Sequence, residues 1–157
     1  LLFRANAVEE ALDQSSIIAG HVILCGYGLF GRVVSEQLES SGIDHVIITN
    51  NTDAFVKAKE ADKSVVFGDP WDRTLLENVR IHDAMGTIIA LDDFDEIQKT
   101  GAAITLLDPD LQVIAKVPTE AERESLQAFN FELILDGNTH TAALLVDQIN
   151  RSRWLAK

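Results

Sequence analysis

The amino-acid sequence predicts an α/β fold in which a doubly wound, six-stranded parallel sheet carries helices on both faces. Short Val/Ile-rich segments that are apolar throughout alternate with helical segments, as parallel strands buried on both faces do. The first such segment, 21–25, runs directly into a Gly-x-Gly-x-x-Gly motif that opens a helix. A length of 157 residues suits a single domain built from these units. Together these observations predict a Rossmann-like arrangement.

The first half of the chain contains three strand–helix units with recognisable ends. Gly42 stands where a C′ glycine would end the first helix. Asp69 is expected as an N-cap, with Pro70 at the first position of the helix that follows. The expected strands are His21–Cys25, His45–Thr49 and Ser64–Phe67, and the expected helices are Leu29–Ser40, Thr52–Ala61 and one that begins at Pro70.

The second half repeats the same alternation three times. Asp93 and Glu96 are spaced to cap a helix that reaches Leu107, and Thr119 with Glu122 forms a capping box for the next helix. The expected strands are Thr87–Leu91, Gln112–Lys116 and Glu132–Leu135, and the expected helices are Asp93–Leu107, Thr119–Phe129 and Thr139–Leu155.

The chain divides into three expected parts. A linker helix over 1–19, centred on 6–14, precedes a Rossmann-like domain over 20–136, and a C-terminal crossover and dimerisation helix covers 137–157. The stretch Gly101-Ala102-Ala103 would let another helix come close. The last helix is more apolar than one buried stripe requires, which predicts a second buried face against a partner. Alternatively, its last apolar residues fold back on the same domain. Its apolar residues are Leu144, Leu145, Val146, Ile149, Trp154 and Leu155.

Charge and composition exclude several classes of partner. The chain has 25 acidic and 13 basic residues, a formal net charge of −12, which argues against nucleic acid and anionic membrane surfaces as partners. No apolar run approaches the ~20 residues that a membrane helix needs, so no membrane insertion is expected. The single cysteine, Cys25, lies in a buried strand and favours a cytoplasmic setting. The start lacks both a signal-peptide pattern and an initiator Met, so we expect a fragment of a longer protein.

The glycine motif is the first candidate site. Gly26 permits the tight turn, Gly28 lets a pyrophosphate approach the backbone, and Gly31 lets the helix pack closely on the strand. The unpaired N–H groups at the helix start would then face the anion, so Tyr27, Leu29 and Phe30 join the site. The alternative is an empty Rossmann turn.

Further candidates follow the ends of the other strands, where ligands bind in this fold. Thr49 stands where NAD sites usually place an acid, so Thr49 and Asn50 either contact ribose or cap the next helix. A missing acid also removes repulsion against a 2′-phosphate, but no Arg stands beside Thr49 to hold one. Asp69 would contact the adenine edge, and Ala90 ends the fourth strand. Lys116, or Arg32 just beyond the glycine loop, would neutralise phosphate.

The sequence shows no catalytic or metal-binding constellation. Asp92, Asp93, Asp95 and Glu96 crowd one turn, which fits either a divalent cation site or an acidic helix start. We favour the helix start, because the spacing matches no Ca²⁺ loop, and we expect no metal. The four histidines are dispersed, and no Tyr-x-x-x-Lys pair is present. The chain therefore predicts a sensor rather than an enzyme.

The order of motifs resembles the RCK family, also called the Trk N-terminal domain family, of potassium channels and transporters. The resemblance covers Gly20 to Ile149. It rests on five stretches: 21–31, 65–70 (Val-Val-Phe-Gly-Asp-Pro), 75–81, 88–93 and 113–116. Three departures stand out, namely Thr49 for the usual acid, Lys116 for a frequent Arg, and 95–98 for the usual Asp-x-x-Asn helix start.

The resemblance implies a cytoplasmic, nucleotide-sensing domain that gates potassium flux through a membrane channel or transporter. NAD(H) or another adenine nucleotide (ATP, ADP or AMP) would bind at the glycine motif. The domains would pair into homodimers and assemble into rings beneath a pore. Two alternatives stay open: the cofactor-binding half of an NAD(P)-dependent oxidoreductase, and a ligand-free Rossmann domain that only mediates assembly.

Overall fold

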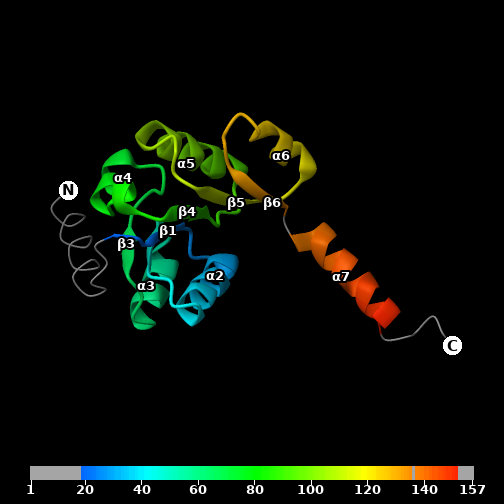
Figure 1. Ribbon diagram of the computed structural model, residues 1–157. Helices are drawn as coiled ribbons and strands as arrows, with labels where there is room; N and C mark the ends of the chain where they lie inside the picture. The colour runs from blue at the N-terminus through cyan, green and yellow to red at the C-terminus, as the bar shows by residue number, and fades with distance from the viewer. Residues whose placement is uncertain (1–18, 136, 152–157) are drawn as a thin grey trace.

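Six parallel strands form one sheet in the order β3-β2-β1-β4-β5-β6. The computed structural model describes residues 19–135 and 137–151 (Figure 1). The strand order reverses at β1, which lies between β2 and β4 at the centre of the sheet. The strands are β1 (Val22–Cys25), β2 (His45–Thr49), β3 (Val65–Phe67), β4 (Gly86–Ile89), β5 (Val113–Val117) and β6 (Glu132–Leu135).

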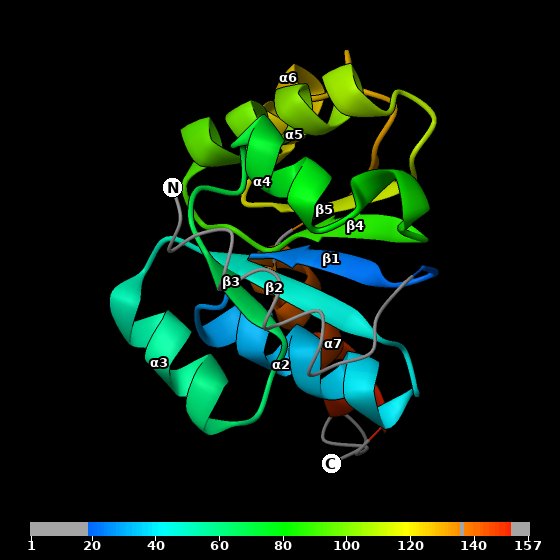
Figure 2. The same cartoon turned by 90° about the vertical axis from the view of Figure 1, so that its left-hand side faces the viewer.

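Helices cover both faces of the sheet, which confirms the predicted α/β, Rossmann-like class. Figure 2 shows α2 and α3 on one face and α4, α5 and α6 on the other. A short 3₁₀ helix, Ile81–Asp83, leads into β4. The helices are α2 (Leu29–Ser40), α3 (Thr52–Glu60), α4 (Arg73–Asn78), α5 (Phe94–Leu107), α6 (Glu120–Ser125) and α7 (Gly137–Arg151).

The core has one layer on each side of the sheet, because successive strand residues point to opposite faces. On the α4–α5 side, Ile23 of β1 packs in a cluster with Leu76 and Ile104. On the α3 side, Leu24 packs in a second cluster with Ala58. All four residues of β1 are buried, which explains why this strand is apolar throughout instead of alternating.

The predicted caps at Gly42 and Asp93 are confirmed, and the predicted start of the fourth helix is wrong. Gly42 has φ +69° and its N–H donates to Glu39 O, as a C′ glycine does. The Asp93 side chain accepts from Glu96 N at 3.0 Å and caps α5. The fourth helix is not capped by Asp69 and does not begin at Pro70. Instead the chain makes a turn in which Asp72 N donates to Asp69 O, and Asp72 then caps α4.

Helix α6 is shorter than predicted. It ends at Ser125 rather than Phe129, because Gln127 N and Phe129 N bond three residues back and tighten the chain into turns. Leu126 is fully buried there, and the Phe129 ring stacks on Phe131 at 4.8 Å between centroids. Of the predicted capping box, the Thr119 hydroxyl accepts from Glu122 N at 3.3 Å.

The chain itself fills the space at Gly101. A Cβ added to Gly101 would lie 2.6 Å from Cε2 of Phe131, so the close approach is made by a ring of the same domain rather than by another helix. Helix α7 runs away from the sheet (Figure 1). Leu144, Leu145 and Val146 on it are 54–66% exposed. The expected helix at 6–14 and the residues Trp154 and Leu155 lie outside the described part of the chain.

His45, at the start of β2, makes stability depend on pH. Its Nδ1–H donates to Ile43 O at 3.3 Å, its Nε2 lies 2.7 Å from the Ser35 hydroxyl, and the residue is buried. Burial lowers the His45 pKa from its usual 6.5. The unfolded chain therefore binds this proton more readily, and the free energy of unfolding falls as pH drops below about 6.5.

We expect urea midpoints to fall from pH 7.5 to 5.5, and to fall less in a His45→Gln variant. The exposed His82 supplies the matched control, because His82→Gln keeps the buried ring. Equal pH slopes in wild type and His45→Gln would contradict the assignment.

Candidate functional site

The three glycines of the loop after β1 have different structural roles. Gly26 has φ +103°, and a Cβ there would lie 2.5 Å from Ala90 O. A Cβ on Gly31 would collide with the carbonyl of Gly26. Gly28 has φ −73°, and a Cβ there would meet only Asp92 Oδ2 at 3.9 Å. The fold itself therefore requires Gly26 and Gly31, and the space in front of Gly28 is open.

The start of α2 lies beside this open space. Its N-cap is Gly28, which has no side-chain cap, and its first turn holds no acidic residue. The first helical bond within this turn runs from Arg32 N to Gly28 O. Because the N–H groups before Arg32 precede that bond, the positive end of the helix dipole is uncompensated and suits an anion.

A pocket of about 570 Å³ opens between the glycine loop and the ends of β2 and β4. Seven predicted site residues line it: Gly26, Tyr27, Gly28, Leu29, Thr49, Asn50 and Ala90. Four others, Phe30, Gly31, Asp69 and Lys116, are not part of its wall. The ends of the central strands thus converge on one cavity, as the topology predicts.

The surroundings of Thr49 fit both alternatives for this residue, contact with ribose and capping of the next helix. Its hydroxyl accepts from Asn51 N at 3.2 Å, and Asn51 in turn caps α3 by accepting from Ala54 N at 2.9 Å. Thr49 is only 4% exposed, yet it lines the pocket. Asn50 Nδ2 donates to Asp69 Oδ1 at 3.0 Å, which ties the end of β2 to the loop after β3. Asp69 therefore stands behind Asn50 rather than in the wall.

Lys116 is held by a carboxylate at the ligand edge. Its Nζ lies 3.0 Å from Asp92 Oδ1 and 4.8 Å from the centroid of the Phe30 ring. The Lys116 side chain is 13% exposed, whereas that of Asp92 is 85% exposed. Asp92 is the residue nearest to the open face of Gly28. A phosphate at the glycine loop would therefore compete with Asp92 for Lys116.

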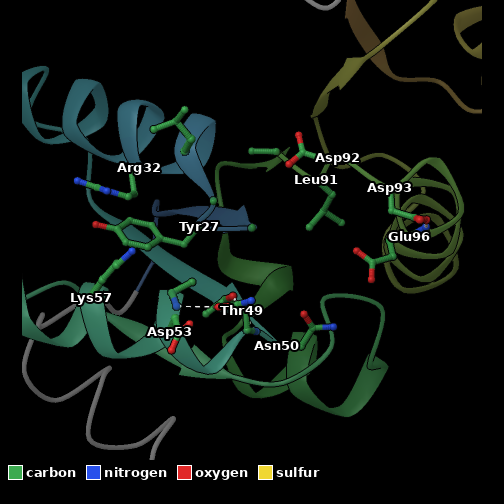
Figure 3. Close-up of a pocket in the computed structure, with 16 residues that line it drawn as sticks. Tyr27, Arg32, Thr49, Asn50, Asp53, Lys57, Leu91, Asp92, Asp93 and Glu96 are labelled. Atoms are coloured by element: carbon green, nitrogen blue, oxygen red, sulfur yellow. Dashed lines mark hydrogen bonds between the residues drawn. The ribbon is translucent and has the colours of Figure 1, made fainter.

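The pocket has a basic end and an acidic end. Figure 3 shows Arg32, Tyr27 and Lys57 together on one side and Asp92, Asp93 and Glu96 on the other. Burial, and then the neighbouring carboxylates of Asp93 and Asp69, raise the pKa of Glu96. The acidic end therefore favours a neutral or cationic ligand group, and the basic end favours an anionic one.

Sequence reasoning found only half of the basic end. It placed Arg32 beside the glycine loop as a possible partner of phosphate, but it found no Arg beside Thr49 and did not single out Lys57. In the structure α2 and α3 lie on the same face of the sheet (Figure 2), and Arg32 and Lys57 line the same wall. The available signals were local: Arg32 follows the last glycine of the motif, and Lys57 lies one helical turn after Asp53. Neither signal shows that the two cations meet.

A family model for the TrkA-N domain matches residues 22–135, which spans every strand of the sheet and the whole pocket. This chain belongs to the TrkA-N domain family. The resemblance to the RCK and Trk N-terminal domains is thereby confirmed.

Two curated relatives of this TrkA-N domain are named as potassium transport proteins. Potassium channel protein 1 of Methanocaldococcus jannaschii is 25% identical over 121 residues, which are 76% of this chain and 36% of that protein. The glutathione-regulated potassium-efflux system protein KefC of Escherichia coli is 30% identical over 113 residues, which are 71% of this chain and 18% of that protein. The domain thus spans about a third or less of the length of these relatives.

Solved structures share the fold. The TrkA-N domain of the inner membrane protein YbaL from Escherichia coli aligns with a TM-score of 0.74 at 21% identity, over 84% of this chain and 98% of that one. The AMP-bound C-terminal domain of Kef from Shewanella denitrificans gives 0.71 at 23%, over 88% and 82%. The GsuK channel bound to NAD gives 0.66 at 23%, over 74% and 21%.

The remaining polar features of the TrkA-N domain are structural. Burial raises the pKa of Cys25 to about 12, so its thiol stays protonated and unreactive at neutral pH. Asp93 caps α5, as the helix-start interpretation of the acidic turn required. Within residues 19–135 and 137–151, no group of three or more His, Cys, Asp or Glu side chains is arranged to hold a metal ion. None of the helices in these ranges is long and apolar enough to span a bilayer.

Proposed function

We propose that this TrkA-N domain is a nucleotide-sensing regulatory domain that controls potassium flux through an associated membrane channel or transporter. The open face of Gly28 beside the uncapped start of α2 carries this proposal. Neither feature is required by the fold, and together they form a backbone cradle for a phosphate next to a pocket of about 570 Å³.

The ligand is NAD(H) or another adenine nucleotide such as AMP, ADP or ATP. Solved relatives of this fold include a Kef domain bound to AMP and the GsuK channel bound to NAD or ADP. In this chain the glycine loop would hold the phosphates and Thr49 the ribose, and Asn50 with Asp69 would border the adenine. Lys116 would exchange Asp92 for a phosphate oxygen.

The domain acts by biasing its parent between two states. A nucleotide shifts such an equilibrium only as far as its affinities for the two states differ. We infer a homodimer, assembled further into a ring on the cytoplasmic side of the membrane protein. The exposed Leu144, Leu145 and Val146 of α7 offer an apolar surface for this pairing. The role is regulatory rather than catalytic.

Substitution of Gly28 tests the nucleotide site. We expect calorimetry to show binding of at least one of NAD⁺, NADH, ATP, ADP and AMP. Gly28→Asp is expected to abolish that binding, because it adds a carboxylate where the phosphates would lie, whereas the isosteric Gly28→Asn keeps part of it. Both variants should keep the wild-type fold, because the Cβ position at Gly28 is open. Absence of binding to the wild type, or equal binding by the two variants, would contradict the site.

Control of potassium flux is tested in the parent protein. In proteoliposomes that contain the full-length parent, the nucleotide found by calorimetry should change the rate of K⁺ flux, and Gly28→Asp should remove the change. If the nucleotide does not change the rate of K⁺ flux through the wild-type parent, the domain binds a nucleotide but does not have the proposed regulatory role.

A further inference from the structure

A second cavity adjoins the first and shares one wall with it. It has a volume of about 560 Å³ and lies between α2 and α3. Among the described residues, three line both cavities: Tyr27, Arg32 and Lys57. The described residues along the passage between the two cavities therefore supply a phenol hydroxyl and two cations, and no carboxylate.

These two cations stand out in an acidic chain. Most basic side chains in the described part of the chain are paired, as Lys63 is with Glu39 at 2.6 Å and Lys116 with Asp92 at 3.0 Å. Neither Arg32 nor Lys57 forms an ion pair with any described residue. Two uncompensated positive charges therefore meet at one wall of the pocket, in a protein of net charge −12.

The carboxylates near this wall lie to either side of it. Asp53 lines only the first cavity, and Glu36, Glu39 and Glu60 line only the second. Glu39 is already engaged by Lys63. An anion placed in the passage would therefore have cations as its nearest partners, with the carboxylates in front of it and behind it.

The end of β2 decides which anion fits. Thr49 places a hydroxyl, not a carboxylate, where a dinucleotide site would hold the adenosine ribose, so no negative charge there repels a phosphate on that ribose. A guanidinium binds phosphate through paired N–H donors, an ammonium adds a point charge, and the Tyr27 hydroxyl supplies a third donor. We propose that Tyr27, Arg32 and Lys57 form a subsite for a 2′-phosphate, so that the domain prefers NADP(H) to NAD(H). This proposal rests on the nucleotide-sensing function proposed above.

Pairs of ligands that differ only in the 2′-phosphate test this proposal. We expect calorimetry to give a dissociation constant at least about tenfold lower for NADP⁺ than for NAD⁺, the effect of one charge-assisted hydrogen bond or more. Adenosine 2′,5′-bisphosphate should exceed AMP in the same way. Because the cations are exposed, the preference should shrink at high salt.

Single substitutions show which side chains produce the preference for NADP⁺. Arg32→Gln and Lys57→Gln should each weaken NADP⁺ binding by about tenfold and leave NAD⁺ binding within about twofold, since each removes one charged partner of the 2′-phosphate. Tyr27→Phe should weaken NADP⁺ binding by a smaller factor. The matched control is Lys59→Gln, which removes the same charge from the same helix outside both cavities, where its Nζ lies over the Phe55 ring.

The outcomes separate the two proposals. If NAD⁺ binds as well as NADP⁺, or if Arg32→Gln and Lys57→Gln weaken both ligands equally, the 2′-phosphate subsite is wrong and the nucleotide-sensing function stands. If neither dinucleotide nor any adenine mononucleotide binds the wild type, the proposed function itself is wrong, and the subsite with it.

Discussion

Gly26→Ala is expected to destabilise the domain by about 3 kcal/mol or more, because it combines a strained backbone with a clash. Gly26 has φ +103°, which L side chains rarely adopt. A Cβ would lie 2.5 Å from Ala90 O and 2.9 Å from Leu91 Cδ2. The first contact is with backbone at the end of β4, which is paired to β1 and cannot give way without disturbing the centre of the sheet.

Thermal unfolding measures the effect. For a domain of this size each kcal/mol lowers Tm by roughly 2–4 °C, so we expect a fall of roughly 6–12 °C or a failure to fold. Gly28→Ala is the matched control in the same loop, and its Tm should stay within about 2 °C of wild type, because the new methyl meets open space and surface changes are usually small. A Gly26→Ala variant as stable as Gly28→Ala would contradict the division of roles among the glycines.

Ile97→Ala is expected to cost about 3 kcal/mol, within the range for truncation of a buried isoleucine. Ile97 is fully buried and belongs to the cluster between α5 and the sheet. It follows Glu96, which lines the pocket, so the same change should loosen the acidic end of the pocket. Urea unfolding should show a lower midpoint with an unchanged m-value.

Leu106 on the same helix provides the control for Ile97. Its side chain is 67% exposed, so Leu106→Ala should change the free energy of unfolding by no more than about 0.5 kcal/mol. Equal costs at the two positions would show that α5 does not bury the face that the structure assigns to it.

The sheet and the glycine loop were predictable because their signals are local. A short apolar run in the sequence predicts each strand, and β1 leads directly into the motif that opens α2. The start of α4 was mispredicted, because Asp69 and Asp72 both precede a plausible first turn and only the turn between them decides which one caps. Helix α6 was predicted too long, because its polar pattern continues past Ser125, where the backbone bonds tighten into turns.

The wall of the pocket was predictable only where it follows strand ends. Gly28, Thr49 and Ala90 end or follow parallel strands, so the topology alone collects them at one edge. Arg32 and Lys57 line one wall because α2 and α3 lie on the same face of the sheet, which no spacing within either helix reveals. The Lys116–Asp92 pair is similar. Lys116 was expected at the ligand edge and Asp92 in the acidic turn, but their contact depends on how far the two side chains reach.

The unequal demands on the three loop glycines have an evolutionary consequence. Replacement of Gly26 or Gly31 disturbs the frame and would be removed by selection on folding alone, with or without a ligand. Replacement of Gly28 leaves the frame intact and closes only the cradle. A lineage could therefore lose the proposed nucleotide site in one mutational step and keep a well-folded domain. In related sequences the outer glycines report shared descent of the fold, and the middle glycine reports whether the site is still in use.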